Sequence, residues 1–473
     1  MKSELRRNQI FIVLVITALM GTFIHSSVSI ALSAIMKDLS ISANTAQWLN
    51  SGYSLVGGII LPLTAFLTKR FTTRKIFYSS SLVLLFGLVL ATFSKSFEIL
   101  MLARVFQAIG SSVLFSLFQV TIMMLYPIEQ RGKITGFYGL LSGIVSVFSP
   151  VISGVLVDTL GWQSIFSICI VVLVFDIIFG LKYLKNCTEV IMVKFDAISF
   201  SLSTLGIFSL LQWVGNISRV PLSDIYMVLL LVTSMVCVGL FLYRQLESDQ
   251  PFLDIRLLKN NQLRAAVIYG VLLHAIIMAI SSIMPIYLQV YRVIPATVAA
   301  LISIPGTIVM AFANPIAGKF YDRKGIDKLL LWGVIMISIS SALFGCLDYH
   351  TPLILVSLLT LVRSLGIGLI LNVIPIWGIS TIEKNDIGSA NAIIQLLRTV
   401  AGSISSVLFV ALATHGVANI TEYEKSAKLH SGISKSFFIV GGLGLILVLI
   451  YFHERKKTKM SLDEKVKTSS NGQ

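Results

Sequence analysis

Fourteen apolar stretches, each long enough to cross a lipid bilayer, follow one another from Ile10 to Phe452. A helix needs about 20 apolar residues to span the hydrocarbon layer, because every backbone amide must be bonded within its own segment. Only 12% of the residues are charged, whereas soluble domains carry roughly 25%. The mean hydropathy is +0.88, and no single soluble core could bury that much apolar surface. The sequence therefore predicts an all-α polytopic membrane protein.

The predicted spans have approximate boundaries that are read from hydropathy alone. They cover residues 10–32, 45–68, 76–94, 99–125, 134–157, 162–183, 196–214, 225–243, 264–290, 296–318, 328–347, 352–379, 387–413 and 436–452.

Lysine and arginine predict the orientation. With a cytoplasmic N-terminus, the cytoplasmic segments hold 27 of the 37 basic residues and the outer segments hold seven. The remaining three lie within spans: Arg104, Arg363 and Arg398. This asymmetry follows the positive-inside rule, so both termini are predicted to be cytoplasmic. The net charge of +15 then mainly reflects the lysines and arginines of the cytoplasmic segments. The basic tail is expected to contact anionic lipid headgroups rather than nucleic acid.

Two pairs of similar segments indicate an internal repeat. The basic turn Lys69–Lys75 after the second span resembles Lys319–Gly325 after the tenth, and the segment that starts at Arg104 resembles the one that starts at Arg363. The offsets are nearly equal, at about 253 and 259 residues, as expected for two six-helix halves separated by two inserted spans. The predicted organisation is an N-terminal bundle (1–185), an inserted pair with its linker (186–260), a C-terminal bundle (261–452) and a basic tail (453–473).

Five motifs in this order resemble the major facilitator superfamily, and most closely its fourteen-span drug:proton antiporters of the EmrB/QacA type. They are Gln47-Trp48-Leu49-Asn50-Ser51-Gly52-Tyr53, the Lys69–Lys75 turn, Arg104-x-x-Gln107-x-x-Gly110, Ser149-Pro150-x-x-Ser153-Gly154 and Tyr321-Asp322-Arg323-x-Gly325. The resemblance implies the major facilitator fold, with fourteen transmembrane helices, and proton-coupled drug export.

Arg104 is the first candidate for proton coupling, because ionisable groups within a membrane span are costly and commonly functional. Gln107, Ser111 and Phe115 follow it at helical spacing and suit the lining of a substrate cavity. The resemblance places the proton-coupling arginine of the family at Arg104. The alternative is an arginine that bonds neighbouring carbonyls and holds helices together.

The thirteenth span carries one polar stripe, formed by Asn391, Gln395, Arg398, Gly402 and Ser405. A helix with a single polar side in a membrane faces either a cavity or another polar helix, and both readings remain open. Asn391, Gln395 and Arg398 are the cavity candidates on this stripe. Arg363 in the twelfth span, as the repeat partner of Arg104, is a further cavity candidate.

Small residues in the fifth span allow close helix packing, and the proline can bend the helix. By resemblance, Ser149, Pro150, Ser153 and Gly154 belong to the antiporter motif that seals the cavity between the halves. Two usual glycines of that motif are replaced here, by Ser149 and Ser153. Tight packing alone is the alternative reading.

The basic turns are the predicted gating loops, through the residues Lys69, Arg70, Arg74, Lys75, Asp322, Arg323 and Gly325. The family usually has an aspartate where this chain has Lys69, so the resemblance implies an altered charge latch in the N-terminal half. The acidic residue that many relatives carry in the first span is also missing.

Two further residues are weighed as proton carriers in its place. His25 has an imidazole, which can shuttle protons near neutral pH, and Asp176 is the one carboxylate clearly within a span. For each, ordinary packing is the alternative.

The leading function is a secondary exporter of amphipathic toxic compounds, coupled to protons, in the bacterial cytoplasmic membrane. The alternative is a dedicated exporter or flippase of one metabolite, peptide or lipid-linked molecule. No GxxxxGK[ST] phosphate loop occurs, which argues against direct use of ATP. The histidines are scattered and no acid pair accompanies them, so an enzyme is not expected. The sequence indicates no cofactor and no metal site, and we expect a functional monomer among membrane lipids.

Overall fold

The computed structural model describes residues 2–41, 43–187, 195–217, 220–221, 223–248, 251, 253–414 and 422–470. The regular secondary structure of these residues is entirely helical, and the fourteen helices among them that are long and apolar enough to span a membrane confirm the predicted spans. Residues 188–194 of the predicted linker region (186–260) lie outside the described residues, as do the side chains of the basic tail (453–473).

Six helices of the first half pack into one bundle around a shared apolar core that runs in sequence from Ile10 to Leu184. This N-terminal bundle consists of α1 (Lys2–Asp38), α2 (Ala43–Arg70), α3 (Thr73–Thr92), α4 (Phe97–Leu125), α5 (Ile128–Leu160) and α6 (Gln163–Tyr183).

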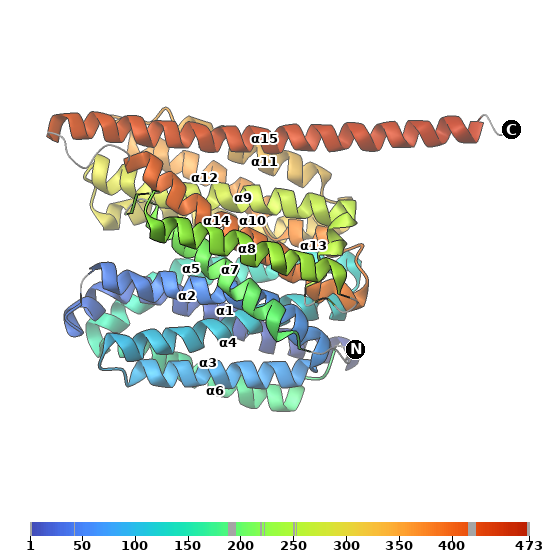
Figure 1. The fold of residues 1–473 in the computed structure, drawn as a ribbon, viewed down its shortest axis with the longest axis horizontal. Helices are drawn as coiled ribbons and strands as arrows, with labels where there is room; N and C mark the ends of the chain where they lie inside the picture. The colour runs from blue at the N-terminus through green and yellow to red at the C-terminus, as the bar shows by residue number, and fades with distance from the viewer. Residues whose placement is uncertain are drawn as a thin grey trace.

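The C-terminal bundle has its own apolar core, which runs from Ala265 to Tyr451. It consists of α9 (Asn261–Pro285) with the π-helical turn η2 (Ile286–Tyr291), α10 (Ala296–Lys324), α11 (Asp327–Phe344), α12 (Leu353–Ile370), α13 (Val373–Ile379), the short turn η3 (Lys384–Asp386), α14 (Ile387–Thr414) and α15 (Glu422–Ser470). Figure 1 shows the two bundles side by side, with the chain ends at the same end of the helices.

The inserted pair, α7 (Ala197–Asn216) and α8 (Ile225–Glu247), lies across the boundary between the bundles (Figure 1). Helix α7 contacts α2 of one bundle and α14 of the other, while α8 packs mainly against α7. The pair therefore covers one side of the seam along which the two bundles meet.

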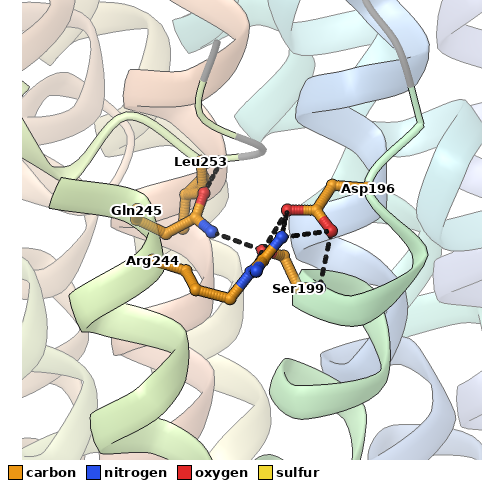
Figure 2. Close-up of polar contacts among 5 residues, drawn as sticks. All are labelled: Asp196, Ser199, Arg244, Gln245 and Leu253. Atoms are coloured by element: carbon orange, nitrogen blue, oxygen red, sulfur yellow. Dashed lines mark hydrogen bonds and ion pairs between the residues drawn. The ribbon is translucent and has the colours of Figure 1, made fainter. Parts of the chain in front are cut away.

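A polar clasp joins the two inserted helices at one end (Figure 2). Asp196 caps the start of α7 and forms an ion pair of 3.1 Å with Arg244 of α8. Gln245 donates to the Ser199 hydroxyl at 2.8 Å and accepts from the Leu253 amide at 2.9 Å. Partial burial by itself raises the pKa of Asp196, but the bonds from Ser199 and Arg244 outweigh it and lower that pKa. The ionised clasp is thus present at neutral pH and lost only as the pH falls through this lowered pKa.

One predicted span is broken. Residues 352–379 form α12 and α13, which are separated by a turn at Leu371 and Asn372. Pro375 has no backbone N–H to donate to Leu371, so a continuous helix would lose a hydrogen bond there. The break turns Asn372 toward Asn314 of α10, to which it donates a hydrogen bond of 2.8 Å.

The predicted turn Lys319–Gly325 is mostly the last part of α10. The helix continues to Lys324 and ends at Gly325, whose positive φ of 74° favours glycine. We call the membrane face that carries this end of α10 and the Lys69–Lys75 turn the basic face, and the other the opposite face. A third apolar cluster, with members from Leu61 to Leu396, joins both bundles and the inserted pair in the half nearer the basic face.

Candidate functional site

Three cavities with shared lining residues lie between the helices. The first, of about 600 Å³, is lined mainly by the N-terminal bundle, through His25, Tyr53, Ser111, Phe115 and their neighbours. His25 stacks on the Tyr53 ring with a centroid distance of 5.4 Å, and the Tyr53 hydroxyl is 2.7 Å from that of Ser111. The sequence-predicted residues His25, Ser111 and Phe115 are thus gathered on one wall.

Arg104 lies behind this wall and is fully buried. Its guanidinium stands 4.2 Å from the centroid of the Tyr53 ring. It donates to the Leu49 carbonyl of α2 and to the side-chain oxygen of Gln107, each at 3.0 Å. Gln107 in turn donates to the Gly87 carbonyl of α3 at 3.1 Å. Arg104 therefore bonds α4 to α2 and supports Tyr53 from behind, and Gln107 is used within the bundle rather than in the cavity lining.

We predict that Arg104→Ala lowers the thermal stability of the purified protein. The change leaves the buried side-chain oxygen of Gln107 without its donor, which costs about 1–3 kcal/mol, and it removes the second donor of the Leu49 carbonyl, which as part of α2 also accepts a bond within the helix. Thermal unfolding in detergent measures the loss, with the exposed Lys95→Ala as the control. If transport is lost while the unfolding temperature stays at the wild-type value, the role of Arg104 is not structural support.

The second cavity, of about 290 Å³, lies between the two bundles, and we call it the floor. The stripe residues Asn391, Gln395 and Arg398 line it, together with aromatic side chains such as Phe118 and Tyr138. Gln395 donates to Gln119 of α4 at 2.8 Å and so joins α14 to the N-terminal bundle. These three residues thus line the cavity, and Gln395 also contacts another polar helix, while Ser405 bonds the Ala275 carbonyl of α9.

The third cavity, of about 470 Å³, lies where α2, α7, α9 and α14 meet. It extends toward the opposite face, where Trp48 at the start of α2 is 39% exposed. His274 of α9 lines both this cavity and the floor. The inserted pair thus supplies part of the wall, through residues near the end of α7.

Several predicted site residues lie elsewhere. Asp176 is 3% exposed in α6 and lines none of the three cavities, and neither of its carboxylate oxygens has a hydrogen-bond partner among the described residues. Arg363 of α12 is only partly buried and also lies outside the cavity lining.

On α5, Ser149 and Ser153 bond Ser27 of α1 at 3.1 and 2.7 Å. In this conformation these two serines pack within the N-terminal bundle and do not seal the halves together.

The basic face is closed by two latches that mirror each other. At the end of α10, Asp322 accepts the backbone N–H groups of Gly132 and Lys133, near the start of α5, at 2.8 and 2.7 Å. At the end of α2, Lys69 forms an ion pair of 2.8 Å with Asp386, next to the start of α14. A helix start carries partial positive charge, which suits Asp322 but not a lysine. Asp386 supplies the negative charge that Lys69 requires.

The other residues of the basic turns have different contacts. Arg74 stays within the N-terminal bundle, where its side chain donates to the Leu181 carbonyl at 3.5 Å and its backbone N–H to Asn186. Lys75 stands 4.8 Å from the centroid of the Phe71 ring. Arg70 lies at the end of α2, and Arg323 is exposed in the last turn of α10.

Helices α5 and α10 approach each other at their backbones beneath the cavity floor. A Cβ atom built on Gly318 would overlap the Gly132 carbonyl, and one on Gly136 would lie 2.5 Å from the Asn314 carbonyl oxygen. Gly154, further along α5, has no neighbour within 4 Å of such an atom. The close approach is thus confined to the part of α5 nearer the basic face, which closes that end of the cavities.

Comparison with known proteins agrees with this architecture. Residues 11–406 match the Major Facilitator Superfamily. The chain belongs to this superfamily.

Several relatives of this transporter cover most of both chains. An uncharacterized MFS-type transporter, YcnB of Bacillus subtilis (strain 168), is 31% identical over 90% of each chain. The lincomycin resistance protein LmrB of the same organism is 30% identical over 86% of this chain and 85% of its own. The riboflavin transporter RibZ of Clostridioides difficile (strain 630) is 24% identical over 95% and 98%.

Among solved structures, the proton:xylose symporter XylE shares the fold, with a TM-score of 0.63 at 15% identity over 95% of this chain and 96% of its own. The protein is therefore a multi-pass membrane transporter and not an enzyme, as the sequence predicts.

Some residues of the site were missed by the sequence reasoning. Asn314 and Asn372 line the floor, and Asp386 completes the latch with Lys69. The two asparagines are polar residues within apolar spans, which is a usable signal. Asp386 carries no such signal in the sequence, because it lies in an ordinary polar loop 317 residues from its partner Lys69.

Proposed function

We propose that the protein is a secondary exporter that carries small amphipathic compounds out of a bacterial cell by alternating access, driven by the proton gradient. The observation that carries the proposal is a cavity between the bundles that is closed at the basic face by two latches and reaches toward the opposite face. With the basic face cytoplasmic, as its lysines and arginines favour, this is the conformation from which an exported compound leaves.

The composition of the cavity supports an amphipathic substrate. Phe115, Phe118 and Tyr138 offer apolar contact area, while Gln119 and Gln395 offer hydrogen bonds. The similarity to a lincomycin resistance protein favours toxic-compound efflux. The similarity to a riboflavin transporter favours the second candidate, a dedicated exporter of one metabolite.

Arg104, His25 and Asp176 remain the proposed proton-coupling residues, and the last two have side chains that can carry the proton itself. His25 faces the cavity beside Tyr53, whereas Asp176 is buried in α6 away from it. A carrier must exchange protons with water on both sides in turn, so His25 is the better placed of the two.

We expect everted membrane vesicles that contain the protein to accumulate at least one compound from a panel of cationic, neutral and anionic drugs when a pH gradient is imposed. An uncoupler should abolish the uptake, and vesicles without the protein are the control. Mutual competition between unrelated compounds would favour the multidrug function, and uptake of a single compound the dedicated one. If no compound of the panel is accumulated with the gradient, proton-driven drug export is wrong.

A further inference from the structure

Arg398 is the most unusual group on the floor of the cavity. It lies in the middle of α14 and its side chain is only 9% exposed. A Cβ atom built on Gly270 of α9 would lie 3.2 Å from the Arg398 Cδ. Because Gly270 has no side chain, the aliphatic part of Arg398 can pass close to α9 and reach the cavity.

The charge of Arg398 is not compensated by the described protein. Its Nε has no hydrogen-bond partner, and the described residues offer its guanidinium no ion pair. No aspartate or glutamate is among the residues that line the floor. A buried cation is costly unless an anion or several acceptors face it. Arg104 differs in degree, because it too is buried and its Nη2 has no partner among the described residues, but it donates to two oxygen atoms through Nε and Nη1.

Further polar atoms on the same floor also lack partners. The amide nitrogen of Asn391 has none among the described residues, nor has Nδ1 of His274. Asn391, Gln395 and Arg398 follow one another at steps of four and three residues, so they lie on one face of α14. Unused donors of an amide and of a guanidinium on one cavity wall form the kind of site that binds an anionic oxygen group.

We propose that Arg398, supported by Asn391, binds an anionic oxygen group, a carboxylate or a phosphate, of the transported molecule. The aromatic side chains of the cavity hold the apolar part of that molecule. This inference rests on the proposed export function, because it names the class of substrate that occupies the same cavity: amphipathic anions or zwitterions rather than simple cations.

Binding to the purified full-length protein in detergent tests the inference. The probes are three acids, rhodamine B, 1-naphthoic acid and dansylglycine, each paired with its own ethyl ester. Each pair differs mainly in one carboxylate. We expect the wild type to bind the acids more tightly than the esters. Arg398→Gln should weaken acid binding about tenfold or more, since a hydrogen bond to a charged group is lost, and should leave ester binding unchanged.

Two variants make the test specific. Arg398→Lys keeps the positive charge but not the planar fork, so it should retain part of the preference for acids. Arg264→Gln removes a cation from the same bundle that donates to Asn261 outside the cavity, and should alter neither affinity. A wild type that prefers no acid over its ester in any pair overturns the inference, as does an equal loss of acid and ester binding in Arg398→Gln.

The failure of this inference is distinguishable from that of the export function. If the vesicles show no gradient-driven uptake while Arg398 still selects acids, proton-driven export is wrong and the anion site stands. If the vesicles accumulate drugs but acids are not preferred, export stands and the anion site is wrong.

Discussion

Gly318→Ala is expected to reduce transport about tenfold or more, because the variant cannot close at the basic face. The added Cβ overlaps the Gly132 carbonyl, and backbone atoms in two packed helices cannot move aside as a flexible side chain can. Inserting a methyl group at such a contact costs about 1–3 kcal/mol, which shifts a two-state equilibrium by about 5- to 150-fold. A transporter that rarely closes one face completes few cycles.

Two measurements separate this mechanism from simple misfolding. Transport is measured in everted vesicles, and the conformation is measured by labelling Ser142→Cys, on the cavity wall, with an impermeant maleimide in a cysteine-free background. Labelling from the basic face should rise in Gly318→Ala. The control is Gly239→Ala on α8, where the new methyl group meets open space. Wild-type transport and unchanged labelling in Gly318→Ala would show that the tight contact between α5 and α10 is not required for the cycle.

Lys69→Asp is expected to impair transport strongly, and Asp386→Lys as a second change is expected to restore it. The ion pair joins the two bundles and its side chains are only 18% and 28% exposed. Replacing attraction by repulsion at this distance costs about 1–2 kcal/mol at a partly exposed site. The population closed at the basic face should then fall about five- to thirtyfold.

The exchanged pair is the decisive control, because it reverses both charges and keeps the attraction. Each single variant should be impaired, and the double variant should transport at a rate near that of the wild type. A neutral variant, Lys69→Gln, should fall between the wild type and Lys69→Asp. If the double variant is as impaired as the two single ones combined, the two residues act independently and do not form a latch.

The mirrored latches explain how this chain tolerates a lysine in place of the aspartate usual at that position. Asp322 binds the start of α5 directly through backbone N–H groups. Lys69 cannot do so, and the acidic Asp386 stands between it and the start of α14. The altered charge in the N-terminal turn is thus balanced by a second alteration in the C-terminal bundle.

The sequence by itself determined the membrane class, the fourteen spans, the paired bundles and the polar face of α14, because hydropathy and helical spacing are local properties of the chain. Only the tertiary structure decided that Arg104 is bonded inside its bundle while the Nε of Arg398 has no partner among the described residues, although both are single arginines in apolar spans. It also decided that Asp386 meets Lys69 and that Asn372 turns toward Asn314. These outcomes depend on how each helix is rotated about its axis and on which distant helix ends meet, and neither is encoded in a local pattern.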